Sequence, residues 1–226
     1  MSATPNPVQD ERGSVRRSLQ RMAGSAVVLG ATALKWAFVF GKFFAFFVSF
    51  ALYSYLFRSW QFGLGLVLLI LVHEMGHFAE AKRQHVHVSL PTFVPFFGAF
   101  VTIRRAHLSP WGNALVSLAG PFVGSIGAAV AWGASSFGDA QVLVGLANLG
   151  FLLNAFNLLP IGFLDGGSVA RAFSEARRGW IRYENGVPVE AMHPDRESAW
   201  KIAFLYVLLA AAIVVGLMAT KQNGSI

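Results

Sequence analysis

Long apolar runs separated by short polar segments dominate the chain. An apolar run of about 20 residues, when helical, matches the thickness of the hydrocarbon core of a bilayer. The pattern predicts an all-α polytopic membrane protein with about five to six transmembrane helices. Five predicted spans cover approximately residues 36–57, 62–81, 111–134, 141–159 and 199–219.

The segment between the second and third predicted spans departs from this helical pattern. Residues 91–103 hold two short β-branched and aromatic runs around Gly98, which is typical of a β-hairpin. At membrane depth, such backbone is tolerated only where protein buries it or where it lines a cavity. We therefore predict a short re-entrant β-hairpin that includes Phe97 and Gly98. An ordinary interfacial loop is the alternative.

The composition supports a membrane protein. The chain is 55% hydrophobic and only 13% charged, with a mean hydropathy of +0.54, whereas soluble domains average about 25% charged residues. With so much apolar sequence, the net charge of +7 favours contact with anionic lipid over binding of nucleic acid. The chain has no cysteine, so any metal site must use His, Asp or Glu side chains.

Lys and Arg gather in alternate polar segments. Residues 1–30 hold four, residues 82–105 hold four and residues 161–198 hold five, whereas the intervening segments hold one, none and one. The positive-inside rule then predicts a cytoplasmic N-terminus. We expect residues 1–30 to form a basic cytoplasmic tail and residues 31–226 to form a single membrane domain. The chain has no evident organelle signal, which favours the plasma membrane of a prokaryote.

An H-E-x-x-H motif, His73-Glu74-Met75-Gly76-His77, follows the apolar run of the second predicted span. On a helix, His73 and His77 project from one face and can share one zinc ion. Glu74 lies on a neighbouring face, where it can act on a metal-bound water without being a ligand. Each ionisable group at membrane depth costs about 2.5–3.5 kcal/mol. A metal site therefore explains the cluster better than a chance motif or a polar contact between helices.

A catalytic zinc usually has three protein ligands, so a third must come from elsewhere. Asp165 directly follows the fourth predicted span, on the side where the histidines are expected, and two glycines after it allow close approach. Asp165 suits the N-cap of a following helix equally well. His85 and His87, which alternate in an extended segment, are further candidates.

Two asparagines, Asn154 and Asn157, lie three residues apart in the fourth predicted span. This spacing places both on the face that points into the bundle. They are expected to form hydrogen bonds between helices, or to hold a loop or a substrate backbone near the metal.

Three elements of the chain, in this order, resemble the motifs of the site-2 protease family of intramembrane zinc metalloproteases. They are the H-E-x-x-H motif, the small-residue motif Ala119-Gly120-Pro121, and an N-x-x-P-x-x-x-L-D-G motif at residues 157–166. The resemblance covers about residues 62–167. It implies that His73, His77 and Asp165 bind one zinc ion per chain and that Glu74 is the catalytic base.

The resemblance also implies a re-entrant β-structure between the first two core helices, which fits residues 91–103. We expect four residues to bind the substrate or to support the oxyanion: Asn154, Asn157, Phe97 and Gly98. Larger members of the family carry a PDZ domain or nucleotide-binding modules, and the loops here are too short for either. A minimal member is therefore expected.

The predicted function is hydrolysis of peptide bonds within or next to transmembrane segments of membrane proteins, near the cytoplasmic face. The alternatives are a non-catalytic membrane scaffold and a metal-transport protein. A transporter would place acidic and His pairs along a path through several helices. Here the charged groups gather at one depth, which favours the protease.

Overall fold

The computed structural model describes residues 30–32, 41, 44–89, 91–94, 98–100, 108–184 and 187–223. The chain divides into two compact units, Met1–Phe44 and Ala45–Ile226, and the elements below belong to the second. The predicted tail of residues 1–30 lies almost entirely outside the described residues. Part of the first predicted span, at residues 36–40 and 42–43, also lies outside them.

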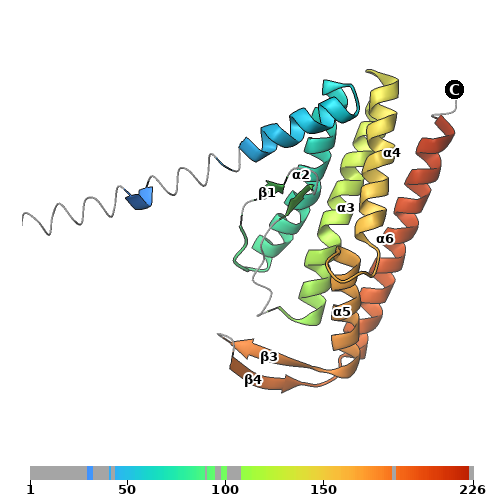
Figure 1. The fold of residues 1–226 in the computed structure, drawn as a ribbon. Coiled ribbons are helices and arrows are strands. Elements are labelled where there is room, and N and C mark those ends of the chain that lie inside the picture. Colours follow the sequence, from blue (N-terminus) through green and yellow to red (C-terminus); the bar gives the residue numbers. More distant parts are fainter. Residues whose placement is uncertain are drawn as a thin grey trace, which may run out of the picture. The chain divides into compact units, whose positions relative to one another are not determined.

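The described elements form a helical bundle with two small hairpins (Figure 1). An apolar helix, Phe44–Leu56, precedes them. The remaining elements are α2 (Trp60–Arg83), β1 (Thr92–Val94), β2 (Gly98–Phe100), α3 (Pro110–Ala134), α4 (Ala140–Asn157), α5 (Asp165–Arg178), β3 (Trp180–Glu184), β4 (Val187–Met192) and α6 (Arg196–Asn223).

Among the described helices, four are long and apolar enough to cross a membrane. They are α2, α3, α4 and the part of α6 from Arg196 to Lys221, and they agree with the second to fifth predicted spans to within a few residues. The helix Phe44–Leu56 falls within the first predicted span but is shorter than a full crossing. The chain is therefore mostly helical, as the hydrophobic pattern predicts.

The spanning helices begin where side chains satisfy the first free backbone N–H groups. Ser59 accepts a hydrogen bond from the N–H of Phe62 at the start of α2. Ser109 and Asp139 act in the same way at the starts of α3 and α4, and α3 also has Pro110 in its first position. Such caps stabilise a helix by about 0.5–2 kcal/mol each and fix its first residue.

The hairpin predicted between the second and third spans is present. Strands β1 and β2 pair antiparallel, with Phe93 opposite Ala99 and Val94 opposite Gly98, and β2 packs beside α2. Gly98 begins the second strand rather than separating the two runs. Phe97 lies outside the described residues.

A second antiparallel hairpin, β3–β4, was not predicted. It follows α5 in the polar segment 168–198, with Trp180 opposite Met192. The sequence contains a signal for it, because Asn185-Gly186 is flanked by runs of alternating side chains.

Helix α3 packs against α2, α4, α5 and α6 and is the centre of the bundle. Glycines permit its close approach to α2. A Cβ atom added to Gly76 of α2 would overlap the carbonyl oxygen of Ala119 in α3. Small residues let helices in a membrane come close enough for dispersion contacts to hold them together. The core shared by α3, α4, α5 and α6 is accordingly rich in alanine: Ala114, Leu118, Ala128, Phe151, Leu158, Val169, Ala172, Ala176, Ala199, Ile202 and Ile213.

Replacing Gly76 by Ala should push α2 away from α3, because the new methyl group meets backbone that cannot rotate aside. We expect a loss of about 1–3 kcal/mol, typical of overpacking, seen as a lower thermal midpoint of the zinc-free protein in detergent. Gly133→Ala in the last turn of α3 is the matched control, since no atom of the described residues lies within 4 Å of the place that its Cβ would occupy. Equal midpoints for the two variants would contradict this account of the α2–α3 contact.

Candidate metal centre

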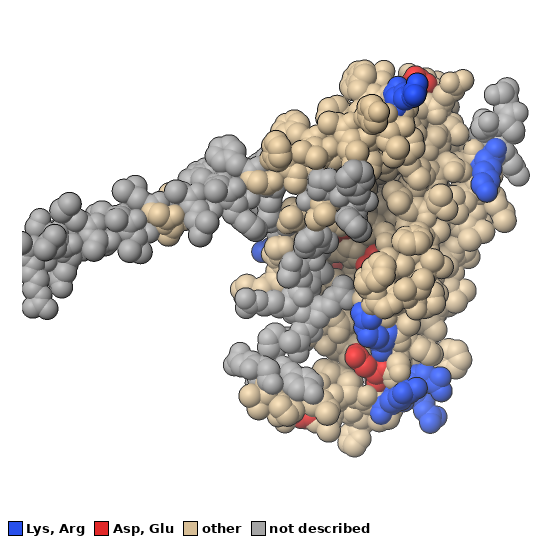
Figure 2. All heavy atoms as spheres, viewed as in Figure 1, with Lys and Arg blue, Asp and Glu red and all other residues tan. Residues whose placement is uncertain are grey.

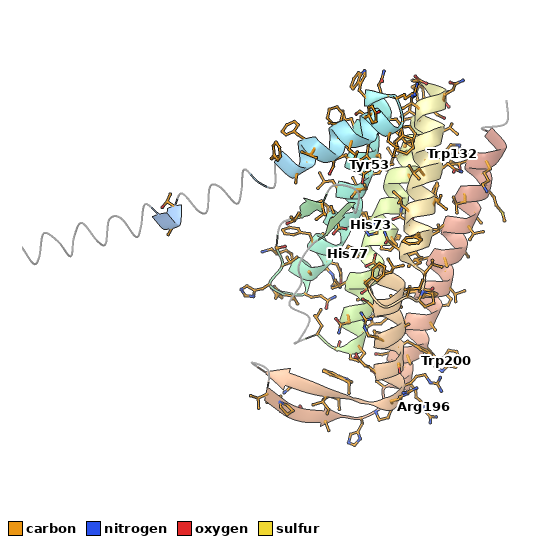
Figure 3. All side chains as sticks on the ribbon, in the orientation of Figure 1. Tyr53, His73, His77, Trp132, Arg196 and Trp200 are labelled. Carbon is orange, nitrogen blue, oxygen red and sulfur yellow. The ribbon has the colours of Figure 1, made fainter. Side chains whose placement is uncertain are left out.

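Three side chains from two helices converge inside the bundle. His73 and His77 lie on one face of α2 and point into the bundle (Figure 3), and Asp165 is the first residue of α5. The Nε2 atoms of the two histidines are 3.2 Å apart. The Asp165 carboxylate lies 3.2 Å from Nε2 of His73 through Oδ2 and 3.3 Å from Nε2 of His77 through Oδ1.

The other nitrogen of each imidazole is held by the neighbouring helices. Nδ1 of His77 lies 2.7 Å from the carbonyl oxygen of Val116, which can only accept a hydrogen bond. Nδ1 of His73 lies 2.7 Å from Oδ1 of Asn154, and the amide nitrogen of Asn154 donates to the carbonyl of Gly150 at 2.9 Å. Both Nδ1 atoms therefore carry the proton in the neutral rings, which leaves a lone pair on each Nε2.

These hydrogen bonds leave three acceptors facing one another: two imidazole lone pairs and a carboxylate. Such a cluster repels itself unless a cation or added protons lie between its members. Zinc suits the donor set, because bonds of about 2.0–2.1 Å in tetrahedral geometry separate ligand atoms by about 3.3–3.4 Å. The Nε2–Nε2 separation of 3.2 Å is close to this value, and each Nε2 has one carboxylate oxygen of Asp165 at 3.2 or 3.3 Å, Oδ2 for His73 and Oδ1 for His77. The three side chains thus fit a zinc ion and leave its fourth position to water or substrate.

Asp165 reaches the histidines because the loop before α5 folds tightly. Leu164, not Asp165, occupies the N-cap position, which disfavours the capping alternative. A Cβ atom on Gly166 would overlap the Leu158 carbonyl oxygen, so only glycine fits there. Arg171 secures the loop by donating to the carbonyl of Gly162 at 2.6 Å.

Two glycines of α3 make room for the metal centre. A Cβ atom on Gly120 would overlap Nε2 of His77, and one on Gly124 would lie 2.6 Å from Oδ1 of Asn154. Gly120 belongs to the small-residue motif of the sequence, and one helical turn separates it from Gly124. The motif thus leaves space for His77 and Asn154 against the backbone of α3.

The remaining predicted residues differ in their distance from the centre. Glu74 adjoins His73 on α2 and is buried, with 7% of its surface exposed. Asn157 ends α4, is half-buried and lies one turn beyond Asn154. The alternative ligands His85 and His87 are exposed near the end of α2 and take no part in the described cluster.

Sequence reasoning missed the carbonyl of Val116, and it interpreted Asn154 as a contact to substrate or to another helix in general. A backbone acceptor leaves no trace in side-chain identity, so Val116 had no signal. For Asn154, the spacing showed that it faces inward, but only the packing of α4 against α2 pairs it with His73.

Two imidazoles from one turn of a helix and a carboxylate from a second helix, inside an apolar bundle, define a helical membrane protein with an H-E-x-x-H metal centre. The profile of peptidase family M50 matches residues 61–140 and 137–193, which together span more than half of the chain. The chain belongs to peptidase family M50, and this confirms the resemblance to the site-2 proteases.

Three curated relatives match part of the chain. The zinc metalloprotease MJ0392 of Methanocaldococcus jannaschii is 28% identical over 52% of this chain and 35% of its own length. The chloroplastic protein EGY1 of Arabidopsis thaliana is 28% identical over 55% of this chain and 31% of its own. Rip3 of Mycobacterium tuberculosis is 31% identical over 53% of this chain and 33% of its own. All three are named zinc metalloproteases, the last two provisionally. The matched part of the chain spans about a third of the length of these relatives.

Replacing Asn154 by Leu should weaken zinc binding by about 10–100-fold, because the Nδ1–H of His73 would lose its acceptor and the ring its orientation. Asn154→Asp keeps an acceptor at the same place and should retain most of the affinity. Competition with a chelator measures both values. If Asn154→Leu bound zinc as tightly as the unmodified chain, the hydrogen bond would have no part in the metal centre.

Proposed function

We propose that the protein is an intramembrane zinc metalloprotease that cleaves peptide bonds within or next to transmembrane segments of other membrane proteins. The observation that carries the proposal is the convergence of His73, His77 and Asp165, whose protonation states leave three acceptors turned toward one another. Family membership supports zinc as the metal. We propose one zinc ion per chain.

Bound by these three side chains, zinc would lower the pKa of water and polarise the scissile carbonyl. Glu74 is the proposed general base. It accepts a proton from the water that attacks the carbonyl carbon, and it passes the proton to the amide nitrogen as the C–N bond breaks. Asn154 is proposed to position His73, since both ends of its amide are engaged. Asn157, with an amide at the end of α4, is proposed to support the oxyanion.

The metal centre is proposed to lie inside the bilayer. Asp165 and Arg178 are the first and last residues of α5, and a rise of about 1.5 Å per residue separates them by roughly 20 Å along the helix. The exposed basic residues near Arg178 are proposed to lie at the membrane surface on that side. By the positive-inside rule that side is the cytoplasm, and we propose a multi-pass protein with five spans, the helix Phe44–Leu56 included, in a prokaryotic plasma membrane.

A transmembrane helix hides its carbonyl groups in its own hydrogen bonds, so a substrate must unwind before it is cleaved. We propose that the β1–β2 hairpin accepts the unwound segment as an added strand. The position of β2 beside α2, the helix that carries the two histidines, supports this role. Gly98, at the start of β2, and Phe97 before it are proposed to contact the substrate.

Replacing Glu74 by Gln should reduce cleavage of a transmembrane substrate by at least about 10²–10⁴-fold, since the amide cannot accept the proton. Zinc content should be unchanged, because Glu74 is not a ligand. The measurement is cleavage in proteoliposomes together with metal analysis of the same sample. Activity near that of the unmodified enzyme would exclude Glu74 as the base, whereas loss of both zinc and activity would give it a structural role.

Replacing Ala99 by Pro should also impair cleavage while zinc is retained, because proline removes a donor from β2 and disrupts its pairing with β1. Val189→Pro in the second hairpin is the matched control, since β4 pairs with β3 and belongs to a sheet separate from β1–β2. Cleavage by the two variants is compared at equal zinc content. Undiminished activity of Ala99→Pro would refute the role of the hairpin in substrate binding.

A further inference from the structure

The C-terminal end of α5 and the N-terminal end of α6 meet beside the β3–β4 hairpin, at the same height along the bundle. The backbone N–H of Asp195 donates to the carbonyl of Ala176 at 2.7 Å, so α6 starts beside the end of α5. Trp200 stands in the first turns of α6, 74% exposed, where the helix changes from charged to apolar (Figure 3). Exposed tryptophans mark the boundary between lipid headgroups and hydrocarbon. The last turn of α5 therefore faces the headgroups.

Two arginines form a positive site at this level. Arg177 and Arg178, together with Phe173 and Ser174, line a cavity of about 330 Å³. The Arg177 guanidinium lies over the Phe173 ring at 5.6 Å, and within the described part of the chain neither arginine forms an ion pair with a carboxylate. Figure 2 shows basic side chains, with acidic ones beside them, around the lower ends of α5 and α6. Two exposed guanidinium groups beside a hydroxyl group are donors suited to a phosphate.

An apolar groove adjoins this positive site. It measures about 260 Å³ and runs between α5 and α6, lined mainly by Val169, Ala170, Phe173, Ile202, Ala203 and Val207. Tyr206 also borders the groove, but its hydroxyl group donates to the carbonyl of Leu158 at 2.6 Å and is engaged there. The groove thus presents carbon atoms to whatever occupies it.

The positive site and the groove adjoin one another along α5. On α5, residues 169–170, 173–174 and 177–178 recur at three- to four-residue intervals and form one stripe along the helix. Phe173 lines both cavities. From Arg177 to Val169 the stripe is about 12 Å long, with its charge at the headgroup level and its apolar part directed toward the bilayer centre.

We propose that this stripe binds one anionic phospholipid, with the phosphate on Arg177 and Arg178 and one acyl chain in the α5–α6 groove. The order of charge and carbon along the stripe is that of a phospholipid in the bilayer. Gly166, next to Asp165, lines the inner end of the groove, so the lipid contacts the helix that carries Asp165.

Native mass spectrometry of the full chain in detergent tests the proposal. The probes are phosphatidylglycerol and phosphatidylcholine with identical acyl chains, added at equal concentrations. The unmodified protein should retain a first phosphatidylglycerol molecule roughly tenfold or more better than phosphatidylcholine. The double variant Arg177→Gln/Arg178→Gln should reduce that preference to about twofold or less. Ala203→Phe, which fills the groove without changing the charge, should weaken retention of both lipids.

The matched control is Arg196→Gln/Lys201→Gln, which removes two positive charges from the neighbouring start of α6 and should keep the preference. An equal loss in this control would mean that charge density alone attracts the lipid, and this would overturn the site. An unchanged preference in the Arg177/Arg178 variant would also overturn it. Undiminished lipid retention by Ala203→Phe would refute the proposal that an acyl chain occupies the α5–α6 groove. An unchanged thermal midpoint confirms that each variant is folded.

Discussion

The fold depends on one constraint: two imidazole lone pairs and a carboxylate must remain within about 3.3 Å of one another inside an apolar bundle. Left alone, these groups repel. The surrounding helices nevertheless fix them there, since α4 holds His73 through Asn154 and α3 holds His77 through the carbonyl of Val116. An arrangement of this kind is stable only with a cation or added protons between the groups, and the proposed zinc ion would supply that charge.

Much of the bundle can be understood as support for that centre. The glycines of α2 and α3 bring the two helices together, and Gly120 leaves the space that His77 fills. Tight packing of the loop before α5 directs Asp165 at the histidines instead of at its own helix N-terminus. If the proposed lipid binds α5, it contacts this same helix through Gly166. The lipid would then contact the residue next to Asp165, a proposed metal ligand.

The sequence predicted the features that depend on local spacing. It did not predict the contacts that depend on how distant segments pack together. The i, i+4 spacing of His73 and His77 is enough to place both on one face of α2. Spacing alone could not distinguish a ligand role of Asp165 from an N-cap role. Its approach to the histidines depends on the fold of the preceding loop, which the sequence pattern does not specify. The pairing of Asn154 with His73 needed the register of α4 against α2. The β3–β4 hairpin is different, since Asn185-Gly186 is a recognisable turn signal that the interpretation of residues 168–198 as one polar segment overlooked.

The most direct test of the account is the zinc content of the detergent-purified chain, compared with Asp165→Ala and with His85→Ala as the matched control. About one zinc per chain is expected in the unmodified protein and in His85→Ala, with a sharp loss in Asp165→Ala, because two imidazoles alone form an incomplete site. Zinc retained in full by Asp165→Ala would contradict the three-ligand centre. So would an unmodified protein that binds no zinc after reconstitution.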